Sequence, residues 1–191
     1  MSGRPNGWDA IRARFESING SQSPLHWADS AFGFLDPDRI EAVQAWDAGD
    51  HRHLVTLGLS DIWGEGDDSH EVAEPAREHT LRFAKDPELD APPDWALRLM
   101  VSTARAALQG GKFLHGHTLD PHGSITGKRF GKLRALAFVR DPRAGEVDTP
   151  NGTVEFIQVV GTTRRQMLDL MSGRIDIEAL SGSDGLNITR T

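Results

Sequence analysis

One apolar stretch, HRHLVTLGLSDIWG at residues 51–64, constrains the fold more than any other part of the chain. Its side chains alternate between two faces, with His51, His53 and Val55 on one face and Leu54 and Thr56 on the other. A two-residue period is typical of a β-strand. Because both faces are largely apolar, the pattern predicts a strand in the middle of a sheet.

Length and charge limit the function classes that the chain can belong to. Its 191 residues suit one domain, spanning residues 1–191, that is large enough to bury a defined core. The formal net charge of −7 argues against binding along a nucleic-acid backbone. No run approaches the roughly 20 apolar residues of a membrane crossing, and the N-terminus lacks the apolar region of a secretory signal. We therefore expect a cytoplasmic protein that binds neither membranes nor nucleic acid.

Helical periodicity appears in three segments. Apolar residues between Trp8 and Ile18 recur at three- and four-residue spacing, and Asn19-Gly20 supplies a stop. Residues 93–109 form a longer apolar surface that begins with proline, which is well tolerated in a first helical turn. Thr163 and Gln166 form a capping-box pair for a short helix that stops at Gly173. We expect the first two helices to dock on a core, and residues 175–180 to form another short helical piece.

Alternation predicts further strands at residues 30–35, 79–85, 133–140 and 153–160, and an edge strand at residues 185–189. Residues 38–46 are ambiguous, since Asp38 could cap a helix or residues 48–50 could turn a hairpin into the strand at His51. We favour the hairpin. Residues 64–75 are acidic and residues 127–134 are basic, and we interpret both as solvated segments.

The stretch at residues 51–64 also resembles the signature strand of the suppressor-of-fused family. A His-x-His opening leads to Gly58-Leu59-Ser60-Asp61 and then to Trp63-Gly64, with Leu54 where the family usually has an aromatic residue. The resemblance continues in His79–Phe83, in the Ala-Pro-Pro-x-Trp sequence at residues 91–95 and in TPNGTVEFIQVVG at residues 149–161. These matches follow the family's order along most of the chain.

Together with the periodicities, the resemblance implies a single α+β domain: a central, mostly antiparallel or mixed β-sheet packed by amphipathic helices. Animal suppressor-of-fused proteins are intracellular, non-enzymatic regulators that bind and restrain a transcription factor in Hedgehog signalling, and this chain resembles their N-terminal domain. Stand-alone versions in bacteria are suspected to be immunity proteins that neutralise toxins by binding them. We therefore expect a protein-binding domain with no catalytic residues, no metal and no cofactor.

The expected partner is another protein, and a basic toxin is the specific hypothesis because complementary charge speeds encounter. The candidate contact surface combines an aromatic residue, an acidic loop and a histidine turn: Trp63, Glu65, Asp67, Asp68, His115 and His117. The identity of the partner and the oligomeric state stay open.

The competing hypothesis is a metal-dependent, cupin-like enzyme. Histidines two apart on a strand point the same way, so His51-x-His53 and His115-x-His117 could chelate one ion, with Asp61 or Glu65 completing the set. Against this hypothesis, the carboxylate spacing fits no metal motif.

A hydrolase is the other enzyme hypothesis. It would use Ser60-Asp61 with His53 or His117, but no Gly-x-Ser-x-Gly nucleophile elbow is present. Ser60 more simply ends the strand.

Overall fold

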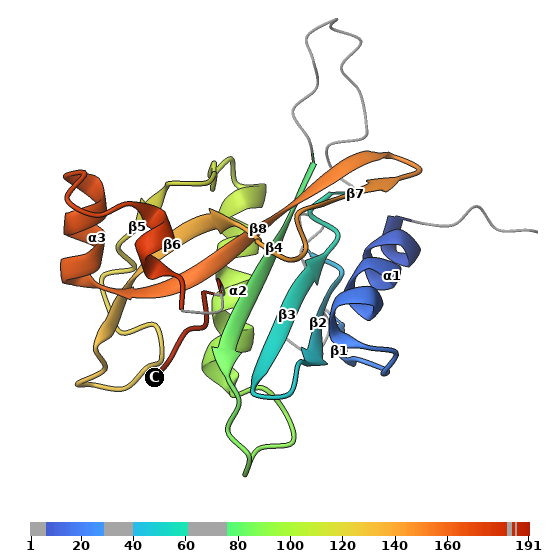
Figure 1. Cartoon of the computed structure of the whole chain (residues 1–191), viewed down its shortest axis with the longest axis horizontal. Helices are drawn as coiled ribbons and strands as arrows, with labels where there is room; N and C mark the ends of the chain where they lie inside the picture. Colours follow the sequence, from blue (N-terminus) through green and yellow to red (C-terminus); the bar gives the residue numbers. More distant parts are fainter. Residues whose placement is uncertain (1–6, 29–39, 61–75, 183–184, 186) are drawn as a thin grey trace, which may run out of the picture.

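A computed structural model of the chain describes residues 7–28, 40–60, 76–182, 185 and 187–191. Within these residues the chain forms one mixed sheet of eight strands with three α-helices (Figure 1). The strands run in the order β1-β2-β3-β4-β8-β6-β5, and β7 pairs with β8. Only the pairing of β4 with β8 is parallel, so the prediction of an α+β fold with a mostly antiparallel sheet is confirmed.

The strands are β1 (Leu25–Ala28), β2 (Ala42–Asp47), β3 (His51–Leu57), β4 (Ala76–Ala84), β5 (Thr118–Leu119), β6 (Leu133–Arg140), β7 (Glu146–Thr149) and β8 (Gly152–Thr163). The helices are α1 (Gly7–Asn19), α2 (Asp94–Leu108), α3 (Arg164–Met171) and the short 3₁₀ helix Ile177–Leu180. The helices expected near Trp8, at residues 93–109, after Thr163 and at residues 175–180 are all present. None of the helices in the described ranges is both long and apolar enough to cross a membrane.

The predicted central strand is β3, and all seven of its residues are buried. It lies between β2 and β4, and both pairings are antiparallel. Gly49 adopts a positive φ of 90° in the turn from β2 to β3, a conformation that favours glycine. The hairpin interpretation of this region is therefore confirmed for its described part, and the helical alternative is wrong.

Two helices cover opposite faces of the sheet (Figure 1). On one face, Leu99 and Met100 of α2 pack in a cluster with Leu54 and Leu81 of the central strands. On the other face, α1 packs through Ile11 and Phe15 in a second cluster, with Trp46, Val55 and Phe156. Burial on both faces agrees with the apolar residues that β3 presents on each of them, and its polar residues are buried as well.

Several strands depart from the predicted pattern. β4 begins three residues before the predicted strand, and β8 extends beyond it at both ends. The pairings of β1, β5 and β7 were not predicted, because strands of two to four residues are too short to show a period. The predicted strand at residues 30–35 and the acidic connection at residues 64–75 lie outside the described residues.

The C-terminal edge strand is a wrong prediction. The segment makes a single parallel bridge between Thr189 and Phe83 of β4. The amide of Thr189 donates to the carbonyl of Arg82 at 2.9 Å, and its hydroxyl accepts from the amide of Gly161 on β8 at 3.1 Å. The segment thus lies between β4 and β8, inside the sheet, and not along its edge.

Candidate functional site

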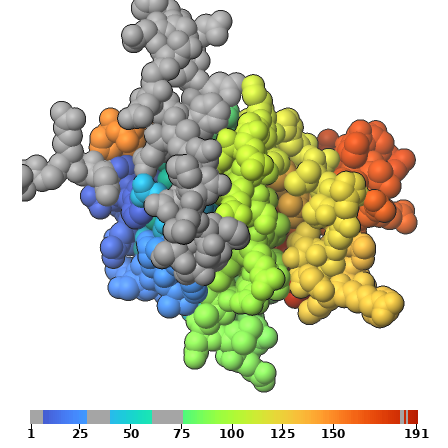
Figure 2. All heavy atoms as spheres, turned by 180° about the vertical axis from the view of Figure 1, so that it is seen from behind, coloured from blue at the N-terminus to red at the C-terminus, as the bar shows by residue number. Residues whose placement is uncertain are grey.

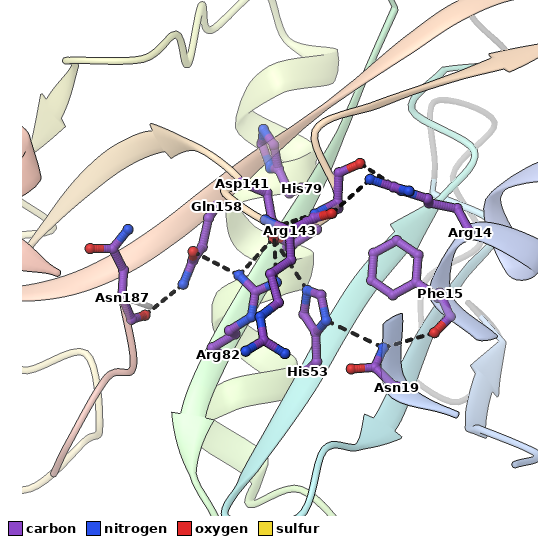
Figure 3. A network of polar contacts seen from close by, with 12 residues as sticks. Arg14, Phe15, Asn19, His53, His79, Arg82, Asp141, Arg143, Gln158 and Asn187 are labelled. Atoms are coloured by element: carbon purple, nitrogen blue, oxygen red, sulfur yellow. Dashed lines mark hydrogen bonds and ion pairs between the residues drawn. The ribbon is translucent and has the colours of Figure 1, made fainter. Parts of the chain in front are cut away.

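A buried ion pair lies at the centre of the polar interior, on the face of the sheet that α1 covers (Figure 3). Arg82 of β4 donates two hydrogen bonds, each 2.8 Å long, to the two carboxylate oxygens of Asp141, which follows β6 directly. Both side chains are fully buried. The hydroxyl of Thr80 donates to the same carboxylate at 2.7 Å, and Arg82 also donates to Oε1 of Gln158 at 2.9 Å.

His53 of the signature strand joins this network. Its Nε2 lies 3.2 Å from Oδ2 of Asp141, and its Nδ1 lies 3.4 Å from the amide nitrogen of Asn19 at the end of α1. Since an ionised carboxylate can only accept, Nε2 carries the proton and Nδ1 accepts from the amide. On the far side, Nε2 of Gln158 donates to the carbonyl of Asn187 at 2.6 Å. The network therefore connects α1, β3, β4, β8 and the C-terminal segment.

The charges of this network follow from burial and from its internal contacts. Burial raises the pKa of Asp141, but the hydrogen bonds from His53 and Arg82 and the positive charge of Arg82 outweigh it and hold the pKa well below its usual range. Burial, reinforced by the positive charge of Arg82, lowers the pKa of His53 to about 4. At neutral pH the network thus holds one carboxylate and one guanidinium, with His53 neutral.

A second buried carboxylate, that of Glu78, accepts hydrogen bonds from the end of the signature strand. Glu78 accepts from the backbone amides of Gly58 and Ser60, both at 3.0 Å, from the hydroxyl of Ser60 at 2.8 Å and from that of Thr56 at 2.6 Å. Burial raises the pKa of Glu78 to about 7, although these donors act in the opposite direction. The Gly-Leu-Ser part of the signature therefore serves as a set of donors for Glu78.

This contact also bears on the hydrolase hypothesis. The hydroxyl of Ser60 donates to Glu78, so a carboxylate and not a histidine is its partner. His53 is bonded to Asp141 and Asn19. Asp61 lies outside the described residues. The described part of the chain therefore does not assemble the proposed nucleophile and base.

The two histidine pairs occupy different environments. In the first pair, Nδ1 of His51 lies 2.8 Å from Oδ1 of Asp50, while His53 belongs to the buried network. The second pair lies in a turn before β5 and not on a strand, which corrects the geometry on which the chelation hypothesis depended. Within the described ranges, no group of three or more histidine, aspartate or glutamate side chains could hold a metal ion.

Of the predicted contact residues, His115 and His117 are described, and both are exposed. Their turn is fixed to β6, because the amide of Gly116 donates to the carbonyl of Phe138 and the amide of Phe138 donates to the carbonyl of His117, both at 2.9 Å. Nδ1 of His117 also lies 2.7 Å from the carbonyl of Lys112. Trp63, Glu65, Asp67 and Asp68 lie outside the described residues, so their grouping with this turn stays a prediction.

No sequence pattern predicted that Glu78, Arg82, Asp141 and Gln158 would form buried polar contacts. The available signal was the position of Arg82 and Gln158, each between two apolar residues of a strand, since a charged or amide side chain in a central strand requires a buried partner. The partner itself could not be identified, because Asp141 follows Arg82 by 59 residues along the chain.

Comparisons with known proteins agree on one family. The family model "Suppressor of fused protein (SUFU)" matches residues 36–180. The human suppressor of fused homolog is 28% identical over 125 residues, which cover 62% of this chain and 25% of the human protein, and the mouse homolog gives the same values. The chain thus spans about a quarter of the length of these curated relatives.

Solved structures show the same fold. The structure described as the Sufu-Fu complex matches 98% of this chain and 91% of its own chain, with a TM-score of 0.77 and 23% identity. Drosophila Suppressor of Fused matches 98% of this chain and 50% of its own, with a TM-score of 0.74 and 24% identity. The match to the family model covers most of this chain and includes the signature strand, so the chain belongs to the suppressor of fused protein family.

Proposed function

We propose that this chain is a non-enzymatic, cytoplasmic protein-binding domain and, more specifically, an immunity protein that neutralises a toxin by direct binding. Membership of the suppressor of fused family supports a protein-binding role in general terms. One structure with the same fold is described as a complex of Sufu with Fu, which names a protein partner for that relative. The toxin is the finer hypothesis and needs its own test.

The observation that carries the proposal is that the buried ionisable groups of the candidate site are bonded to other groups of the protein. The side chains of His53, Glu78 and Asp141 are at most 1% exposed, and each is hydrogen-bonded to other protein groups. A general base or nucleophile must come within hydrogen-bond reach of its substrate. Groups enclosed in this way stabilise a rigid scaffold, whose function then depends on its surface.

For the contact surface we retain the turn at His115 and His117 together with Trp63, Glu65, Asp67 and Asp68. The turn is exposed yet held to β6 by two backbone hydrogen bonds, so little conformational entropy is lost when a partner binds there. The net charge of −7 favours a basic partner surface, which electrostatic attraction would bring in faster.

The test uses basic proteins encoded next to the gene for this chain. Each is expressed in a bacterial host with and without the chain, and growth is followed together with co-elution of the two proteins. We expect one of them to stop growth, the chain to restore it, and both proteins to elute as a stoichiometric complex. Rescue at amounts far below those of the toxin would indicate turnover and contradict a non-enzymatic role.

Variants then locate the surface. Replacing His115 and His117 by alanine should weaken the complex about tenfold, which is typical for a contact near the centre of an interface. His122→Ala is the matched control, because this side chain is 89% exposed and lies in another turn. Unchanged affinity in the double variant would contradict the assigned surface. A stoichiometric transition metal in the purified protein, lost when His51 and His53 are replaced, would instead support the metal-dependent enzyme.

A further inference from the structure

The loop before β6 is basic, exposed and ordered. It consists of two successive turns, closed by hydrogen bonds from the amide of Gly127 to the carbonyl of Ser124 at 3.2 Å and from that of Gly131 to Lys128 at 2.9 Å. Gly131 also lies so close to Ser124 that a Cβ atom there would be 2.4 Å from the serine Oγ. In both views the loop projects from the body of the molecule, at the lower right in Figure 2.

An exposed phenylalanine lies within the second turn of this loop. The side chain of Phe130 is 88% exposed, more than that of any other large apolar residue in the described ranges. It borders a mainly apolar cavity of about 470 Å³, to which Leu133, Lys132 and Arg190 also contribute. We call Phe130 with the cavity and its surrounding cations the Phe130 surface. The guanidinium carbon of Arg129 lies over the Phe130 ring, 5.4 Å from its centroid, so the exposed ring and a positive charge lie together on this surface.

Three cations of the Phe130 surface lack carboxylate partners in the described part of the chain. Lys128, Arg129 and Lys132 are exposed and form no ion pair there. Other exposed arginines do have such partners, for example Arg12 with Glu16 at 3.0 Å and Arg164 with an aspartate at 2.6 Å. The net charge of the chain is −7, so this cluster of unpaired cations has the opposite sign of charge from the protein as a whole.

We propose that the Phe130 surface docks an acidic peptide segment of a partner protein, with an apolar side chain of that segment entering the cavity. The charges select the acidic flanks, and the apolar lining selects the inserted side chain. The turns fix the loop in advance, which lowers the entropic cost of binding. This surface has the opposite sign from the one assigned to a basic toxin, so the inference does not rest on the proposed function.

Single-stranded nucleic acid is the other class that cations around an aromatic ring can bind. Two observations favour the peptide. A phosphate backbone requires cations along a track, whereas Lys128, Arg129 and Lys132 are confined to one short loop. The net negative charge of the chain also repels a polyanion that extends beyond the loop.

Fluorescence anisotropy of the full chain tests the proposal with three labelled probes. They are an acidic peptide with a central Leu-Phe pair, the same peptide with Ala-Ala at the centre, and a single-stranded oligothymidylate of equal charge. We expect the Leu-Phe peptide to bind tightest, about tenfold tighter than the Ala-Ala peptide, with an affinity that falls as salt is raised. Tighter binding of the oligothymidylate, or no binding of any probe, would overturn the proposal.

Variants separate the two parts of the surface. Phe130→Ala should weaken the Leu-Phe peptide about tenfold and leave the Ala-Ala peptide unchanged, and Lys128→Glu with Lys132→Glu should weaken both peptides. The matched controls on α3 are Met171→Ala, which removes an apolar side chain that is 69% exposed, and Arg165→Glu, which reverses a charge on a side chain that is 92% exposed. Equal losses in the controls and the loop variants would refute the assignment.

Discussion

Replacing Asp141 by asparagine is the most direct test of the buried network. Asp141 accepts two bonds from Arg82 and further bonds from His53, Thr80 and the backbone amides of residues 143 and 144. Asparagine keeps the shape but removes the charge, and its NH₂ group would face donors. The guanidinium of Arg82 is fully buried and cannot lose its proton, so it would remain as an unpaired charge.

The expected loss is large for a protein of this size. Removing one partner of a buried ion pair lowers the free energy of unfolding by about 3–5 kcal/mol, out of a total of about 5–15 kcal/mol. Urea unfolding followed by fluorescence of the five tryptophans measures this loss, with the m-value checked for two-state behaviour. Arg12→Gln is the matched control, since it removes an exposed pair with Glu16 that contributes about 0.5 kcal/mol or less.

A double variant separates the effect of the charge from that of lost packing. With Asp141→Asn already present, Arg82→Met removes the unpaired cation and should recover about 1 kcal/mol or more. A decrease of less than about 1 kcal/mol in the free energy of unfolding of Asp141→Asn would refute the reasoning, because an unpaired charge in the interior should destabilise the folded state by more than that. So would a double variant whose loss equals the sum of the two single losses, since the pair would then be uncoupled.

Two further predictions use the same unfolding assay. Burial lowers the pKa of His53 and of His79 to about 4 and raises that of Glu78 to about 7. Between pH 6 and 5 both histidines are protonated in the unfolded chain but not in the folded chain, whereas Glu78 is protonated in the folded chain only. The unfolded chain therefore binds about one proton more, so the free energy of unfolding should fall by about 1.4 kcal/mol for each pH unit that the pH is lowered. His79→Leu should bring this slope close to zero, and an unchanged slope would contradict the assignment. Gly58→Ala should reduce stability by about 1–3 kcal/mol, because φ is +108° and a Cβ would lie 2.8 Å from a backbone nitrogen, whereas Gly123→Ala, where the nearest atom is 4.0 Å away, should have little effect.

Local pattern predicted the elements that have enough residues to show a period. The alternation in β3 and the spacing in α1 predicted the correct elements, and the spacing in α1 also predicted its buried face, because both patterns depend on neighbours within a few residues. The capping box at Thr163 was equally local, and its two reciprocal bonds are present at 3.2 Å and 2.9 Å. The short strands β1 and β5 are defined by the strands beside them, so their own sequences carried too little information.

By itself the sequence determined the central strand, the helices that flank it and the family of the chain, since these follow from short-range periodicity and from several motifs in the family's order. Only the tertiary structure decided the partners of the polar residues in that interior. Arg82 meets Asp141, and the C-terminal segment enters between β4 and β8, because a buried polar group must find a partner wherever the folded chain brings one. That requirement acts in space and not along the chain, so sequence spacing does not reveal it.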